Sequence, residues 1–331
     1  MKVSKKIMAT ALAALTMSMS LAGCGSSTSS TTDNSSEAGK VYNIGICQLV
    51  THDALDAATK GFKEAVIAGL GEENVNFIEQ NAAGDNNTCT TIVNDFVSKD
   101  VDLIMANATG ALQAAANATV DIPILGTSIT EYGVALEIDD FTGTVGGNIS
   151  GTSDLAPLED QAQMILDLVP DAKTVGLLYC SAEPNSSYQV KVVREFLEGK
   201  GLTVKDYAFS ASSDVAQVAE AAAAESDAIY IPTDNTAASC TETINNVVLP
   251  TKTPIIAGEA GICTGCGIAT LSISYEELGK KTGEMAVEIL KDGKDISEMA
   301  IAYDDNPVKK YNKTICDELG ITIPEDYEVL E

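Results

Sequence analysis

The chain has 331 residues, a hydrophobic content of 45% and a formal net charge of -28. That length suits two lobes better than one core, and the apolar content excludes a disordered body. The acidic balance excludes nucleic acid and anionic lipid headgroups as electrostatic partners.

The first 23 residues have the pattern of an export signal. Three lysines within the first six residues precede a short apolar stretch that ends at Leu21-Ala22-Gly23-Cys24. A basic start, an apolar core and a small-residue cleavage site are typical of a secretory signal, and the stretch is too short to span a bilayer. A cysteine directly after the small residues resembles a bacterial lipoprotein signal, cut before a cysteine that is then lipidated. We therefore expect a chain lipidated at Cys24 and held on the extracytoplasmic face of the cell membrane.

Residues 24–40 begin with this cysteine and continue as a run rich in serine and threonine, without apolar periodicity. Such composition is typical of a flexible tether. The sequence thus predicts a membrane contact through the lipid anchor only.

From Val41 onward, strand and helix patterns alternate. Apolar runs predict strands at 42–49, 75–78, 101–105 and 122–126, with helices between them around 55–66, 92–97 and 110–118. The glycine-rich segment 142–157 interrupts the alternation and predicts a crossover. Beyond it we expect strands at 174–179, 203–209, 228–231, 254–257 and 267–273, and helices at 161–169, 188–197, 215–224, 236–247 and 276–290. This pattern predicts an α/β fold of two Rossmann-like lobes with parallel sheets and a ligand cleft between them.

The cysteines give no disulfide framework, because seven remain when Cys24 is set aside. Cys263-Thr264-Gly265-Cys266 is the one Cys-x-x-Cys, and His52 is the one histidine. A structural zinc site needs four ligands, so the sequence predicts neither metal nor cofactor. A thiol redox enzyme that uses Cys263 and Cys266 stays open as an alternative. No nucleophile elbow or phosphate-binding loop occurs, and we expect that the protein is not an enzyme.

Polar residues that directly follow the predicted strands are the candidates for a ligand site, since ligands of open α/β sheets bind at the carboxyl ends of strands. They are Gln48, Thr51, His52, Asp85, Thr109, Thr127, Ser128, Asn185, Ser186, Ser187, Asp234, Asn235 and Glu259. Helix N-capping is an alternative role for any single one of them, because capping uses the same residue types.

A small zwitterion such as an amino acid suits these groups. Its carboxylate would bind at helix starts near Thr109 and the run Asn185-Ser186-Ser187, where the helix dipole is positive. Its ammonium would bind the carboxylates of Asp234 and Glu259, with Asp85 as a further candidate. Tyr132, Phe141 and Tyr275 could wall an aromatic side chain. Sugars and nucleosides stay open as alternative ligands, although the chain has no tryptophan on which a sugar ring could stack.

Several stretches resemble ABC-transporter substrate-binding lipoproteins, a family that includes tryptophan/tyrosine transporter binding components. They include GICQLVTHDALDAATKGFKEAV, VDLIMANATGALQAA, EPNSSYQ, DAIYIPTDN and SYEELGKKTGEMAVEIL. The resemblance implies a type I periplasmic-binding-protein fold whose hinge has several segments. It also implies a monomer that captures a solute and delivers it to an ABC permease and its ATPase. A sensory role of the same binding module stays open.

The resemblance further implies how the chain is divided between the lobes. We expect a first lobe of residues 41–154 plus 276–294 and a second lobe of 155–275 plus 295–331. Four positions depart from the family pattern. Asp53 stands where many relatives have proline, Cys180 stands where asparagine is common, and Cys263 and Cys266 lie in a loop that usually lacks cysteine.

Overall fold

The computed structural model describes residues 40–304 and 306–330. The predicted export signal, Cys24 and the tether up to residue 39 lie outside the described residues. Within the described ranges, no helix combines the length and the apolar character that a bilayer span requires.

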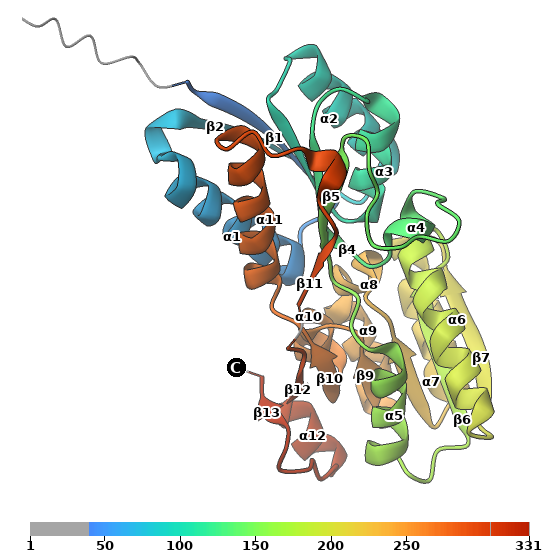
Figure 1. Ribbon diagram of the computed structural model, residues 1–331. Helices are drawn as coiled ribbons and strands as arrows, with labels where there is room; N and C mark the ends of the chain where they lie inside the picture. The colour runs from blue at the N-terminus through green and yellow to red at the C-terminus, as the bar shows by residue number, and fades with distance from the viewer. Residues whose placement is uncertain (1–39, 305, 331) are drawn as a thin grey trace, which may run out of the picture. The chain divides into compact units, whose positions relative to one another are not determined.

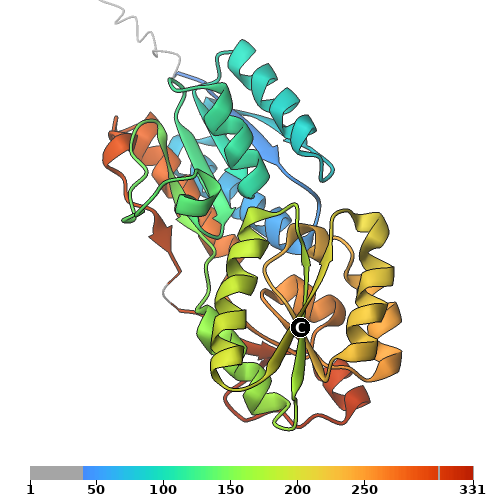
Figure 2. The same cartoon turned by 90° about the vertical axis from the view of Figure 1, so that its right-hand side faces the viewer.

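The described chain forms two β-sheets, each with helices packed on both faces (Figure 1, Figure 2). The first sheet has the strand order β11-β5-β4-β3-β1-β2, with every pairing parallel. The chain is buried along the whole of β3 and β4, as expected for central strands of a parallel sheet. The strands are β1 (Tyr42–Gln48), β2 (Val75–Asn81), β3 (Leu103–Asn107), β4 (Ile124–Ile129), β5 (Ile149–Ser153) and β11 (Ala302–Tyr303).

Helices pack on both faces of the first sheet, and each face has its own hydrophobic core. One core joins Ile44 and Leu103 of the sheet to Phe62 of α1 (Asp53–Leu70) and Met285 of α11 (Tyr275–Leu290). The other joins the opposite face to α2 (Asn86–Ser98) and α3 (Thr109–Ala118) through residues such as Phe96. Three short elements complete this first lobe: η1 (Glu72–Asn74), α4 (Tyr132–Ala135) and η4 (Ile296–Glu298).

The second sheet has the order β13-β12-β10-β9-β8-β6-β7 and is parallel except between β10 and β12. Its strands are β6 (Thr174–Cys180), β7 (Thr203–Phe209), β8 (Ala228–Ile231), β9 (Ile255–Ala257), β10 (Ala269–Ser272), β12 (Val308–Tyr311) and β13 (Glu328–Val329). One core packs α5 (Leu158–Leu168), α6 (Pro184–Gly199) and α12 (Lys313–Leu319) on the sheet. The other packs α7 (Val215–Glu225), α9 (Thr241–Val248) and α10 (Ala260–Cys266). This second lobe also contains η2 (Ser212–Asp214), α8 (Asn235–Ala238) and η3 (Leu249–Thr251).

The chain crosses between the two lobes three times. It leaves the first sheet after β5, returns after β10 to form α11, and leaves again after β11 to form β12. The predicted α/β class with two lobes of mainly parallel sheet is confirmed by this topology.

The glycine-rich segment 142–157 is not simply a crossover, because it contains strand β5 of the first sheet. The sequence Ile149-Ser150-Gly151-Thr152-Ser153 has one large apolar residue and gives no apolar run. Its polar side chains are nevertheless buried and paired within the lobe. Ser150 Oγ donates to the Met299 carbonyl at 2.9 Å, and the Thr152 hydroxyl lies 2.8 Å from that of Thr282. Hydrogen bonding therefore replaces apolar character in this strand.

The prediction that the second lobe resumes at residue 295 is also wrong, because the last crossing comes later in the chain. Ile296 and Met299 pack into the first lobe's core, and β11 pairs with β5, so residues 295–303 belong to the first lobe. A two-residue strand has no periodicity that would have shown this. The predicted helix 236–247 is two helices, α8 and α9, and the short helix α10 was not predicted.

Helices α1 and α11 lie side by side with their backbones in close approach (Figure 1). A Cβ added at Gly279 would lie 2.0 Å from the Ala58 carbonyl oxygen, and one at Gly61 would lie 2.1 Å from that of Glu276. Only glycine allows this separation. The contact fastens the segment that returns from the second lobe onto the first.

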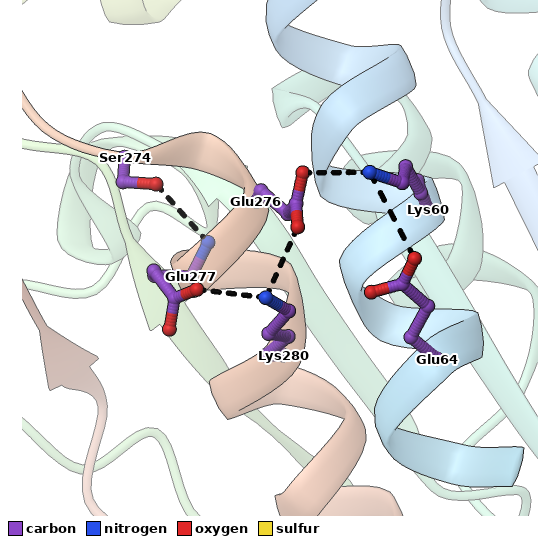
Figure 3. A network of polar contacts seen from close by, with 6 residues as sticks. All are labelled: Lys60, Glu64, Ser274, Glu276, Glu277 and Lys280. Atoms are coloured by element: carbon purple, nitrogen blue, oxygen red, sulfur yellow. Dashed lines mark hydrogen bonds and ion pairs between the residues drawn. The ribbon is translucent and has the colours of Figure 1, made fainter. Parts of the chain in front are cut away.

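Exposed ion pairs also connect these two helices (Figure 3). Lys60 Nζ lies 2.9 Å from Glu276 Oε2, and Lys280 Nζ lies 3.0 Å from Glu276 Oε1. Solvent and salt screen such pairs, and ordering long side chains costs entropy, so their net contribution is small.

We therefore expect Lys60→Ala to leave the free energy of unfolding unchanged within the error of a urea titration. The same titration in 1 M salt provides the control, because screening removes the pair without a substitution. A clear loss of stability that salt reproduces would show that the network holds the helices together.

Candidate functional site

The carboxyl ends of strands from both sheets meet at an enclosed cavity of about 10 Å³. Its lining includes His52, Ser128 and Asp154 from the first lobe's strand ends and Asn185, Asn235 and Glu259 from the second. Lys and Arg are absent from its lining in the described part of the chain. The space holds about one water molecule. Wider hollows of about 230 and 280 Å³ adjoin it and share the side chains of Asn235 and His52 respectively.

Asp234 is a buried carboxylate whose two oxygens are already occupied. It caps α8, where Oδ1 accepts a hydrogen bond from the Ala237 N–H at 2.8 Å. Oδ2 accepts from the Cys180 N–H at 2.6 Å and from Ser186 Oγ at 2.8 Å. Burial, together with the neighbouring Glu183 carboxylate, raises the pKa of Asp234. Asp234 is therefore an anchor between β6, α6 and α8.

Glu259 is held in the same way at the start of α10. Its Oε1 accepts from the Ile262 N–H at 2.5 Å and its Oε2 from the Gly261 N–H at 2.6 Å. Burial raises the pKa of Glu259, and the nearby His52 imidazole acts against this shift. Both predicted ammonium partners thus serve as helix caps, the alternative that the sequence left open.

Asp154 is the carboxylate that the sequence analysis missed. It follows β5 directly and is 4% exposed. Its Oδ2 accepts from the Tyr275 hydroxyl at 2.9 Å, whereas its Oδ1 has no hydrogen-bond partner. Burial raises the pKa of Asp154 to about 6. The signal that could have found it is the one used elsewhere, a polar residue after a strand, but the strand itself was not recognised.

Ser128 is a second buried group in this cavity without a partner. Its Oγ makes no hydrogen bond, and its backbone has a φ of 56°, in the left-handed region that serine rarely adopts. The pairing of β4 with β5 shifts register between Gly126 and Ile129, around this residue. The bulge turns the end of β4 and places Ser128 at the cavity wall.

His52 makes a hydrogen bond that joins the two lobes. Its Nε2 lies 3.3 Å from Asn235 Oδ1. The Asn235 amide is oriented by Glu183, whose Oε2 accepts from Asn235 Nδ2 at 2.7 Å. The Asn235 oxygen is therefore the acceptor, so Nε2 of His52 carries the proton. Within residues 40–304 and 306–330, no other side-chain hydrogen bond connects the lobes away from the three crossings.

The structure brings six predicted residues to the cavity: His52, Ser128, Asn185, Asp234, Asn235 and Glu259. Ser186 lies behind them, bonded to Asp234. Ser187 is exposed at the surface of α6. Of the predicted aromatic walls, Tyr275 lines the cavity, while Tyr132 and Phe141 stack on each other at 6.4 Å within the first lobe.

The remaining predicted residues have structural roles in the first lobe. Gln48 is bonded to Val50, Asp56 and Thr59, and the Thr127 hydroxyl lies 3.2 Å from that of Thr152. Asp85 is exposed and caps α2 through Thr88. Thr51 is exposed and accepts from Asn81, and Thr109 is buried in the first turn of α3. A position directly after a strand is therefore not enough to show that a residue of the first lobe faces the second.

The thiols of Cys263 and Cys266 are buried in α10, and burial raises the pKa of both. A protonated, buried thiol is a poor nucleophile, which argues against redox chemistry at this motif. Across the part of the chain that the structure describes, no group of three or more histidine, cysteine or acidic side chains is arranged to hold a metal ion.

Comparison with known proteins identifies the family. Residues 43–330 match the family of ABC transporter substrate binding proteins. The chain belongs to this family. A tyrosine-binding protein of Clostridioides difficile (strain R20291) is 35% identical over 98% of this chain and 91% of its own length. This ABC substrate-binding protein is therefore similar to solute-binding proteins.

Two solved structures resemble this substrate-binding protein closely. A Streptococcus pneumoniae ABC domain in complex with L-Trp is 32% identical, with a TM-score of 0.84 over 88% of this chain and 100% of its own. A ligand-free, open substrate-binding protein with adhesive properties from Clostridium difficile is 37% identical, with a TM-score of 0.67 over 88% of this chain and 99% of its own. Similarity at this level extends over both lobes.

Proposed function

We propose that this substrate-binding protein captures an amino acid in the cavity between its lobes and delivers it to an ABC permease for import. The observation that supports this function is a buried, polar cavity at the strand ends of both sheets. Asp154 in its lining has one carboxylate oxygen without a hydrogen-bond partner. A buried carboxylate oxygen without a partner is costly, and an ammonium group would satisfy it. The tyrosine-binding and L-Trp-bound relatives support an aromatic amino acid as the ligand.

The cavity volume of about 10 Å³ is far smaller than an amino acid. Binding therefore requires the lobes to separate and close again around the ligand. The hinge for this motion is formed by the three crossings, and bound ligand shifts the population toward the closed arrangement.

We further propose that the protein is a monomer, lipidated at Cys24 and tethered to the extracytoplasmic face of the membrane. The support is the sequence pattern around Cys24 and the serine- and threonine-rich run behind it. Labelled lipid incorporation tests the anchor, with Cys24→Ala as the variant that should lose the label. Size-exclusion chromatography of the mature domain tests the monomer.

A thermal-shift screen of the mature domain tests the ligand class. Amino acids, nucleosides, sugars and short peptides are compared at equal concentration, since a ligand that binds only the folded state raises the melting temperature. Aromatic amino acids should give the largest shifts. A tight sugar or nucleoside with no amino-acid response would contradict the proposed ligand. Loss of uptake on deletion of the ABC permease that the protein serves, with binding intact, would separate import from sensing.

The bond between His52 and Asn235 predicts a role in ligand retention. We expect His52→Ala to speed ligand release about fivefold, because a neutral hydrogen bond contributes about 1 kcal/mol. Stopped-flow dissociation of the amino acid found in the screen measures the rate. His52→Gln is the matched control, since its amide N–H can still donate to Asn235. Equal release rates for wild type and His52→Ala would show that the bond does not hold the lobes together.

A further inference from the structure

The carboxylates around the cavity differ in one respect that decides where an ammonium group can bind. Each oxygen of Asp234 and Glu259 already accepts at least one hydrogen bond from the protein. Asp154 is different because Oδ2 accepts from Tyr275 while Oδ1 is buried without a partner. An added N–H donor would satisfy the one oxygen of Asp154 that has no partner, whereas every oxygen of the other two carboxylates already has at least one.

We propose that Asp154 and Ser128 together form the ammonium subsite of the ligand cavity, and that Asp234 and Glu259 shape the cavity without binding the charged nitrogen. The assignment rests on the proposed amino-acid function and names the residues that recognise one end of the ligand.

Ser128 supports the assignment independently of the carboxylate. Its Oγ is a second buried atom with no partner, and it lines the same cavity as Asp154. Its left-handed backbone, with φ of 56°, is unfavourable for serine. Strained residues of this kind persist where the surrounding structure fixes them, and they concentrate at binding sites. An ammonium group has three donors, so it can bond to both Oδ1 of Asp154 and Oγ of Ser128.

The position of Asp154 connects this subsite to the hinge. Asp154 begins the first crossing, and Tyr275, which donates to it, is the first residue of α11 after the second crossing. A bound ammonium would thus contact a carboxylate that bridges two of the three chain segments between the lobes. Tyr275 holds Oδ2 and leaves Oδ1 free to accept from the ligand, so Tyr275 is a positioning residue for this contact.

The test compares ligands with and without the ammonium in wild type and Asp154→Asn. The probes are L-tryptophan and L-tyrosine, each paired with its deaminated acid, 3-(indol-3-yl)propanoate or 3-(4-hydroxyphenyl)propanoate. Calorimetry of the wild type should show a preference of about 100-fold for the amino acid, as expected for a charge-assisted contact in a buried site. In Asp154→Asn the preference should fall below about tenfold. The matched variant Asp234→Asn should keep the wild-type preference.

Ser128→Ala provides a second variant in case Asp154→Asn does not fold. It should lower the ammonium preference about fivefold without changing affinity for the deaminated acids, as expected for one lost hydrogen bond. An unchanged preference in Asp154→Asn, or one lost in Asp234→Asn or Glu259→Gln instead, overturns the assignment while leaving amino-acid binding intact. Failure of the wild type to bind either amino acid overturns the proposed function as well.

Discussion

Gly279→Ala is expected to lower the free energy of unfolding by about 3 kcal/mol, the upper part of the range for overpacked cores. The new Cβ would lie 2.0 Å from the carbonyl oxygen of Ala58. That oxygen belongs to the backbone of α1 and cannot rotate away as a side chain could. Helices α1 and α11 would have to move apart, which opens the core that contains Phe62 and Met285. Urea unfolding followed by circular dichroism measures the change.

Gly199→Ala is the matched control for this prediction. Gly199 is the last residue of α6, and a Cβ built there meets nothing within 4 Å. Alanine has the higher helix propensity, so we expect unchanged stability or a gain of up to about 1 kcal/mol. Equal stability of the two variants would mean that the helices separate at little cost and that their close approach does not hold the lobe together.

The second large effect is a dependence of the free energy of unfolding on pH that arises from Asp154. We expect Asp154→Asn to match the wild type in stability near pH 4 and to exceed it by about 3 kcal/mol at pH 8, in the absence of ligand. Burial raises the pKa of Asp154 in the folded protein to about 6, against 3.8 for an ordinary aspartate. The folded state therefore binds the proton more tightly than the unfolded state. Stability from this group is present below pH 4 and is lost as the pH rises to 6.

Urea titrations of both proteins between pH 4 and 8 measure this difference. Asp171→Asn, at an exposed aspartate, is the control for the effect of an aspartate-to-asparagine substitution outside the cavity. Burial also raises the pKa of Asp234, to about 8, so the stability of the wild type should continue to fall above pH 6. A constant difference between wild type and Asp154→Asn across the range would show that Asp154 is not charged in a buried site.

Bound ligand should reverse the order of stability of the wild type and Asp154→Asn. At pH 8 an amino acid whose ammonium pairs with Asp154 stabilises the wild type more than Asp154→Asn. Affinity of the wild type should fall as the pH drops below about 6, because protonated Asp154 no longer attracts the ammonium.

The sequence predicted the strands only as far as apolar patterns reach. Strands such as Leu103–Asn107 and Ile124–Ile129 begin with apolar residues and are buried throughout, so their apolar runs identified them. Strand β5 is buried through paired hydroxyls, and no apolar pattern exists for it. Asp154 was missed for the same reason, since it could be recognised as a strand-end residue only once β5 was known.

The lining of the cavity was predicted only in part. The position of a residue after a strand places it near the cavity but does not show whether its side chain lines it. His52, Asn235 and Glu259 were found in this way. Gln48 and Asp85 also follow strands, yet one is consumed by hydrogen bonds within the first lobe and the other caps a helix at the surface. Which polar groups are left without a partner depends on tertiary neighbours that sequence spacing does not contain.

The placement of α11 and β11 has a consequence for how the chain acquires its structure during synthesis. The first lobe is completed by residues 275–303, which follow almost the whole second lobe in the sequence. Until they emerge, the glycine face of α1 has no partner and the core around Ile44 and Phe62 stays open to water. The amino-terminal half therefore cannot mature ahead of the rest, and a nascent chain that stops before residue 275 is a target for chaperones and proteases.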